Sequence, residues 1–74
     1  MIISIELFGQ LSPQSQRRQT LELALHAKVQ EAVELLGINP DEIGLITING
    51  VQSEMQDILQ PECRLCFFPY VTGG

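Results

Sequence analysis

The chain has 74 residues, which is the size of one domain, and 45% of them are hydrophobic. This composition favours a folded core over a disordered chain. The formal net charge is −5, and the only cluster of cations is Arg17-Arg18. Because nucleic-acid binding releases counterions at clustered cations, the charge argues against a nucleic-acid partner and favours a protein partner with a basic surface.

The pattern of apolar residues argues against a membrane partner. The longest apolar run falls far short of the roughly 20 residues that span a bilayer. The residues from Met1 to Glu6 lack the basic region that begins a secretory signal. We therefore expect a cytoplasmic protein.

Residues 2–8 alternate between apolar and mostly polar side chains, which predicts a half-buried strand. The expected core face carries Ile3, Ile5 and Leu7, and the outward face carries Ser4, Glu6 and Phe8. Residues 9–16 are rich in turn formers and predict a loop. Residues 18–25 alternate again, so the two strands are expected to form a hairpin. The expected core face of the second strand carries Leu21, Leu23 and Leu25.

The period then changes, and residues 27–36 are predicted to form one amphipathic helix. Its apolar stripe consists of Val29, Ala32, Val33 and Leu36. Gly37 fits the position that ends a helix, and Pro40 prevents it from continuing.

Three further segments complete the predicted sheet. Residues 44–48 form an apolar strand, and Asn49-Gly50 is a strong hairpin-turn signal before a short return strand at residues 51–53. Residues 63–68 form the last strand, with Leu65 and Phe67 toward the core. A single helix after a hairpin has to cover one face of a mixed sheet of four or five strands. The simplest such α+β core is a ubiquitin-like β-grasp, and an unrelated α+β roll is the alternative.

Cys63 and Cys66 suggest at first a redox or metal motif. A spacing of three along a strand places the two side chains on opposite faces, so they cannot easily form a disulfide or share a metal. A zinc site needs more ligands, and His26 is the only histidine. We therefore expect two small hydrophobic side chains and no metal site. The alternative is an exposed, oxidisable Cys66.

The last residues read as an arm beyond a domain that spans residues 1–69. Pro69 cannot donate a ladder hydrogen bond, so the sheet is expected to end there, and residues 70–74 form a flexible tail. Gly73 and Gly74 lack Cβ atoms, so they can pass through a narrow slot and present the Gly74 carboxylate without a nearby side chain. An inert terminus is the alternative.

A free carboxylate is a poor acyl donor and has to be activated, for example by adenylation. The chain has no phosphate-binding glycine loop with a lysine and no nucleophile–histidine–acid set. We therefore expect a protein that is not catalytic alone, binds no cofactor and depends on an activating partner enzyme.

The last eight residues resemble the closing segment of the molybdopterin synthase small subunit, which typically reads Phe-Phe-Pro-Pro-Val-Ser/Thr-Gly-Gly. In this chain they are Phe67-Phe68-Pro69-Tyr70-Val71-Thr72-Gly73-Gly74. Residues 3–9 resemble that family's opening strand, and residues 46–50 resemble its third strand and turn. The thiamine-pathway sulfur carrier shares the fold and the Gly-Gly end.

The resemblance implies that a ubiquitin-activating-type enzyme adenylates Gly74 with ATP and that a sulfur donor then converts the adenylate to a thiocarboxylate. The tail would deliver the sulfur to a second enzyme, which is the synthase large subunit or another acceptor. The partner-binding residues implied by the resemblance and the strand pattern are Phe8, Arg64, Phe68, Pro69, Tyr70, Val71 and Thr72. The first and last strands are neighbours in the implied fold, so the outward residues Phe8 and Phe68 are expected to form one exposed apolar patch near the tail.

Three departures from the molybdopterin pattern leave the pathway open. The chain is shorter than many members, Tyr70 replaces the usual second proline, and residues 60–63 replace an acidic turn. The alternatives are a sulfur carrier for thiamine or another metabolite, a protein modifier conjugated through Gly74, and an interaction module with an inert tail.

Overall fold

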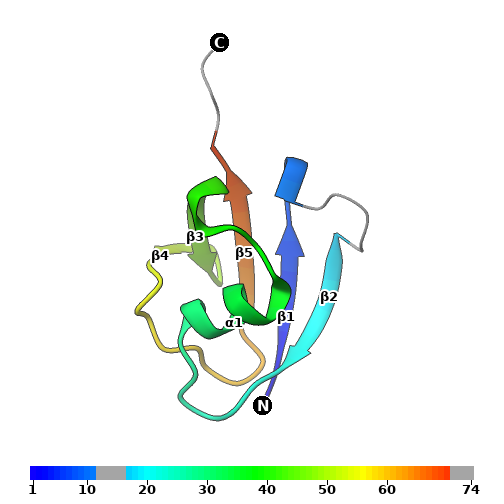
Figure 1. Ribbon diagram of the computed structural model, residues 1–74. Coiled ribbons are helices and arrows are strands. Elements are labelled where there is room, and N and C mark those ends of the chain that lie inside the picture. Colours follow the sequence, from blue (N-terminus) through cyan, green and yellow to red (C-terminus); the bar gives the residue numbers. More distant parts are fainter. Residues whose placement is uncertain (12–16, 71–74) are drawn as a thin grey trace.

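The computed structural model describes residues 1–11 and 17–70. Figure 1 shows the strands and helices in chain order. Their bounds are β1 (Ile2–Leu7), the 3-10 helix η1 (Gly9–Leu11), β2 (Arg18–Glu22), α1 (Val29–Leu36), the 3-10 helix η2 (Pro40–Glu42), β3 (Ile43–Ile48), β4 (Val51–Ser53) and β5 (Arg64–Pro69).

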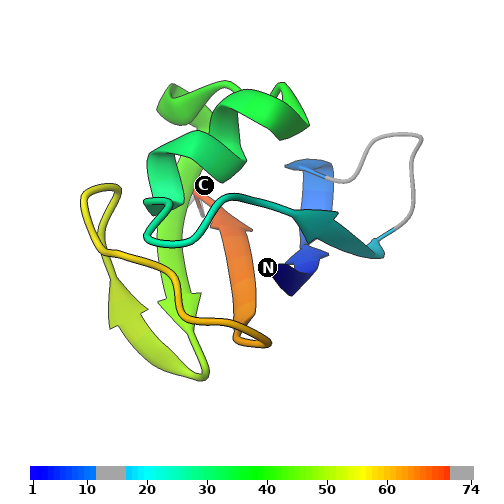
Figure 2. The same cartoon turned by 90° about the horizontal axis from the view of Figure 1, so that it is seen from below.

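The strands form one mixed sheet in the order β2-β1-β5-β3-β4. The central strand β5 runs parallel to β1 and antiparallel to β3, while β2 and β4 pair antiparallel at the two edges. Figure 2 shows α1 lying across one face of this sheet. This is the predicted β-grasp arrangement of one main helix on a five-stranded sheet.

The β1–β2 hairpin confirms the first alternating pattern and corrects part of the second. Ile3, Ile5 and Leu7 are buried, as expected. Leu23 is also buried, but Leu25 is 65% exposed, so its expected place in the core is wrong. The reason is that β1 begins at Ile2, whose partner is Glu22, and β2 has no partner strand beyond that point.

Helix α1 begins two residues later than the sequence pattern suggested. The backbone N of Lys28 donates to Oε2 of Glu31 at 2.8 Å, which closes the first turn from the N-terminal side. At the other end, Gly37 adopts the left-handed conformation with φ 72°, and its N–H and that of Ile38 bond to the last turn. Gly37 therefore ends the helix as predicted.

The Asn49-Gly50 pair forms the predicted turn between β3 and β4. Both residues have positive φ, 51° and 83°, as a tight hairpin turn of this kind requires. The side-chain Oδ1 of Asn49 also accepts a hydrogen bond from the backbone N of Arg64 at 2.8 Å. The turn is thereby tied to the start of β5.

The core lies between α1 and the sheet. Its most deeply buried side chains are Phe67, Ile3, Ile5, Leu59, Leu65, Val29 and Val33. Cys63 belongs to this core, whereas Cys66 is buried on the other face of the sheet, beside Glu6 and Thr47. The two thiols are free and lie on opposite faces as predicted, but Cys66 is only 6% exposed, so the alternative of an exposed Cys66 is wrong.

Within residues 1–11 and 17–70, no helix is both long enough and apolar enough to cross a membrane.

Candidate functional site

The C-terminal segment leaves the sheet from its central strand. Strand β5 lies between β1 and β3 and ends at Pro69. Figure 1 shows that this end of β5 lies at the same end of the sheet as η1. Four of the predicted site residues, Val71, Thr72, Gly73 and Gly74, lie outside the described residues. The structure therefore describes the root of the predicted tail, at Pro69 and Tyr70.

Two glycines approach this root closely. A Cβ atom on Gly44 would lie 2.9 Å from the carbonyl oxygen of Pro69 and 2.9 Å from the Cα of Tyr70. A Cβ atom on Gly9 would lie 2.8 Å from Cγ of Pro69. Contacts this short do not occur between real Cβ atoms and their neighbours, so the backbone path at Pro69 and Tyr70 depends on these two glycines.

Gly44 also interrupts the ladder between β3 and β5. Ile43 pairs with Pro69 and Leu45 pairs with Phe68, so Gly44 is an extra residue without an opposite partner. Such a bulge bends a strand and increases its local twist. The bulge and the close approach of Gly44 occur together where β5 ends, and they set how the chain leaves the sheet.

The outward faces of β1, β5 and β3 carry an apolar surface next to this root. The rings of Phe8 and Phe68 stack with centroids 4.5 Å apart and an interplanar angle of 8°. Leu45 is the cross-strand partner of Phe68 and is 37% exposed. We call Phe8, Leu45 and Phe68 the outer-face patch. The stacking agrees with the sequence prediction that Phe8 and Phe68 lie together on the face away from the helix.

A group of charged side chains borders the outer-face patch on the β2 side. The guanidinium carbon of Arg17 lies 4.9 Å from the centroid of the Phe8 ring. Glu6 is half-buried, and its Oε2 lies 3.9 Å from Nε of Arg17 and 3.5 Å from Nε of Arg18. Both arginines are largely exposed, so each ion pair contributes little on its own. Together they place a cation over the aromatic stack.

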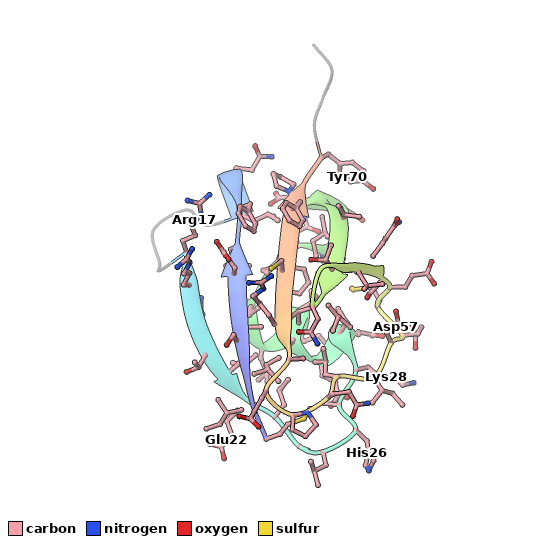
Figure 3. All side chains as sticks on the ribbon, turned by 180° about the vertical axis from the view of Figure 1, so that it is seen from behind. Arg17, Glu22, His26, Lys28, Asp57 and Tyr70 are labelled. Atoms are coloured by element: carbon pink, nitrogen blue, oxygen red, sulfur yellow. The ribbon has the colours of Figure 1, made fainter. Side chains whose placement is uncertain are left out.

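The other predicted partner-binding residues divide into two groups. Tyr70 is 60% exposed and lies at the root, and Figure 3 shows it at the same end of the sheet as Arg17. Arg64 is exposed but begins β5, four residues before Phe68, which separates the two by roughly 13 Å along the strand. The structure therefore does not bring Arg64 to the outer-face patch.

Five residues of this region were not predicted from the sequence as parts of the site. They are Glu6, Gly9, Arg17, Gly44 and Leu45. Glu6 and Leu45 could have been found, because strand alternation puts Glu6 on the face of Phe8 and leaves Leu45 outward beside the inward Ile46. Arg17 precedes β2, so strand alternation does not place its side chain. The contacts of Gly9 and Gly44 depend on how segments distant in the sequence pack together.

The described part of the chain contains no metal-binding cluster. Within residues 1–11 and 17–70, no three histidine, cysteine, aspartate or glutamate side chains gather in a way that could hold a metal ion. The features of the site are thus an exposed apolar surface and a geometrically constrained exit for the C-terminal segment.

The topology of one helix on a five-stranded mixed sheet places this chain in the class of ubiquitin-like β-grasp proteins, which includes sulfur carriers and protein modifiers. The model of the ThiS family matches residues 5–74, and the chain belongs to that family. This confirms at the family level the resemblance to sulfur carriers seen in the sequence. A search of curated proteins gave no match.

Solved structures agree on the fold. The chain is similar to small archaeal modifier protein 1 from Haloferax volcanii, with a TM-score of 0.80, 22% identity and full coverage of both chains. It is similar to a putative molybdopterin converting factor subunit 1 from Pyrococcus furiosus, with a TM-score of 0.78 and 16% identity over 95% of this chain and 98% of the other. A complex of subunits 1 and 2 of the molybdopterin-converting factor from Helicobacter pylori contains a chain with a TM-score of 0.67 and 16% identity, both chains fully covered.

Proposed function

We propose that this protein is a sulfur carrier that is activated at the carboxylate of Gly74 and donates sulfur as a thiocarboxylate. The observation that carries the proposal is the position of the Gly-Gly segment. In the sequence it comes shortly after Tyr70, and the described chain that leads to it leaves the central strand β5 at Pro69, beside the outer-face patch of Phe8, Leu45 and Phe68. A partner that docks on the patch would have the tail within its reach.

The chemistry requires two partner-catalysed steps. The carboxylate oxygen of Gly74 attacks the α-phosphorus of ATP, pyrophosphate leaves, and an acyl-adenylate forms. A hydrosulfide-level donor then attacks the carbonyl carbon, AMP leaves with the adenylate oxygen, and the product is a thiocarboxylate. The chain supplies only the acyl group, and ATP is used by the adenylating enzyme.

The length and the amino-acid composition of the tail suit entry into a second enzyme. Five residues follow Pro69, and an extended segment of that length reaches about 17 Å. The absence of Cβ atoms at Gly73 and Gly74 leaves the reacting carbon accessible in a narrow channel. The half-buried rings of the outer-face patch belong to a residue type that often contributes much of the binding energy at protein interfaces.

The acceptor pathway that fits best is molybdopterin biosynthesis, with a synthase large subunit as the second partner. Support comes from the resemblance of residues 67–74 to the closing segment of the molybdopterin synthase small subunit. The structural neighbours from Pyrococcus furiosus and Helicobacter pylori point the same way, and the latter is a complex of subunits 1 and 2. Thiamine biosynthesis is the alternative pathway, supported by the family match.

A second candidate function is conjugation of Gly74 to lysine side chains of target proteins. It is favoured by the similarity to small archaeal modifier protein 1 and to Urm1 from Trypanosoma brucei, the latter with a TM-score of 0.70 and 18% identity. Both functions begin with the same adenylate. A modifier would give a ladder of stable isopeptide conjugates in cells that disappears when Gly74 is deleted.

The first step is tested by exchange of labelled pyrophosphate into ATP, using the adenylating enzyme from the same genome. We expect exchange to depend on this protein and to be lost when Gly74 is deleted. The deletion should leave the melting curve unchanged, because the last strand of the sheet ends at Pro69, before the deleted residue. Exchange that persists without Gly74 would contradict the proposal.

A further inference from the structure

Strand β2 is an edge strand whose second side is free within the described part of the chain. The sheet order places β2 first, paired with β1 alone (Figure 1). Sheet edges are usually protected by proline, a bulge or a charge that points inward. The β1–β2 register is regular over five residue pairs, and the inward side chains of β2 are Gln19 and Leu21. None of these three protections is present in β2, and its charged side chains, Arg18 and Glu22, are both exposed.

The hydrogen bonds at the two ends of the hairpin show which backbone groups face the free edge. The N–H of Leu7 bonds to the carbonyl of Arg17, and the N–H of Leu23 bonds to the carbonyl of Met1, each at 2.8 Å. Hydrogen-bonded pairs alternate along an antiparallel ladder, so the odd-numbered residues of β2 turn their backbone groups toward β1. The N–H and C=O groups of the even-numbered residues therefore face outward. These residues are Arg18, Thr20 and Glu22.

These three residues are self-complementary. In an antiparallel pair of two such edges, only residues whose backbone groups face outward can exchange hydrogen bonds. The register centred on Thr20 uses all of them, with Thr20 opposite Thr20 and Arg18 opposite Glu22 of the second copy, twice by symmetry. We propose that two copies of this chain pair through β2 in this register and form one continuous sheet.

Charge selects this register over its neighbours. Glu22 is exposed, and the side chain of Arg18 is 82% exposed even though its Nε lies 3.5 Å from Oε2 of Glu6 in the same copy, so both are accessible to a second copy. Opposite charges across a strand pair stabilise it, and like charges destabilise it by a similar amount. A slip of two residues places Arg18 opposite Thr20 and loses both charge pairs.

A hollow lined by polar and apolar side chains on the helix side of β2 is partly covered by the same pairing. It has a volume of about 520 Å³, and its lining includes Leu21 of β2 and Leu35 and Leu36 of α1. Leu35 is 63% exposed. In the proposed register the two Leu21 side chains are diagonal neighbours on the helix side, at a spacing of about 7–8 Å that leucines can bridge. The rim of the hollow therefore gains an apolar contact.

The proposed dimer is weak and depends on concentration. A five-residue strand pair buries less than the roughly 1,200 Å² of stable interfaces. Each copy carries a formal charge of −5, so two copies repel each other. The pairing is best tested at about 0.15 M salt, where this repulsion is screened beyond about 8 Å. The pairing leaves the outer-face patch of each copy uncovered, and it does not rest on the proposed function.

Sedimentation equilibrium of the full chain from about 10 μM to about 1 mM tests the pairing, because this range brackets weak association. We expect the average mass to rise from one copy toward two. Arg18→Glu or Glu22→Arg alone should weaken association about tenfold or more, because each creates two like-charge pairs. The double variant R18E/E22R should restore it, since the two charges are exchanged.

Thr20→Pro supplies a variant that does not depend on charge. It removes an N–H that faces the free edge and leaves the ladder with β1 intact, so association should be lost while the circular dichroism spectrum is kept. Two control variants, Lys28→Glu and Glu54→Arg, make the same charge changes away from β2 and should leave association unchanged. Figure 3 shows Lys28 on the other side of the molecule from Glu22. A protein that stays monomeric throughout, or a double variant that fails to restore association, would overturn the proposal.

Discussion

Phe8 directly follows β1 and Phe68 lies in β5, the parallel neighbour of β1, and their rings stack at 4.5 Å on the face of the sheet opposite the helix. An aromatic pair of this geometry is worth about 0.5–1.5 kcal/mol beyond its buried area. We expect that coupling energy from a double-mutant cycle of Phe8→Ala, Phe68→Ala and the double variant, measured by urea unfolding. Additive losses would show that the two rings stabilise the fold independently.

The outer-face patch should also carry much of the binding energy for the adenylating enzyme. Phe68→Ala is expected to weaken that complex by about 2 kcal/mol, the size typical of a buried aromatic anchor. Leu25→Ala is a matched control, because Leu25 is an exposed apolar residue that follows the far end of β2. Titration calorimetry with the adenylating enzyme measures both. Equal losses in the two variants would place the docking surface elsewhere.

Gly44 should control the exit of the tail. Gly44→Ala puts a Cβ atom against the backbone of Pro69 and Tyr70, so it should shift the amide resonances of Tyr70 and lower the rate of thiocarboxylate formation. Overpacking of this kind destabilises by about 1–3 kcal/mol.

Gly50→Ala is a control for Gly44→Ala, because it should lower stability without affecting where the tail leaves the sheet. Its Cβ atom would meet nothing within 4 Å, but its φ of 83° makes the substitution strained. We expect Gly50→Ala to lower the melting temperature without changing the rate at a temperature where both variants are folded. Equal rates in the two variants would show that Gly44 has no role in positioning the tail.

Comparing Leu25 with Leu65 tests directly which leucine belongs to the core. Leu65 is fully buried, and Leu65→Ala should cost about 2–5 kcal/mol of unfolding free energy. Leu25→Ala should change it by no more than about 0.5 kcal/mol, because the side chain is mostly in solvent. Chemical denaturation measures both. A large loss at Leu25 would support the original expectation that it packs in the core.

The sequence was sufficient for the order of elements because each one carries a local signal. The alternation around Ile3 and Ile5, the helical stripe of Val29 and Val33, and the Asn49-Gly50 turn each specify a structure over a few residues. The prediction failed at Leu25 because alternation indicates which face of a strand a residue occupies but not how far the partner strand extends. The hairpin ladder stops at Glu22 because its partner strand β1 begins at Ile2.

The site was predictable only where strand alternation reached it. The shared face of Phe8 and Phe68 followed from counting residues outward from the core. The position of Arg17 over Phe8 and the approach of Gly44 to Pro69 follow from loop path and a bulge, neither of which has a local sequence signature here. Arg17 comes beside Phe8 through the β1–β2 hairpin, and Gly44 comes beside Pro69 through the pairing of β3 with β5.

The central claim is that the carboxylate of Gly74 becomes a thiocarboxylate. Intact mass spectrometry after incubation with the adenylating enzyme, ATP and a sulfide donor tests it most directly. We predict the mass gain of one oxygen replaced by sulfur, absent without ATP and absent when Gly74 is deleted. Consumption of ATP with no sulfur gain, or a gain that survives the deletion, would contradict the account.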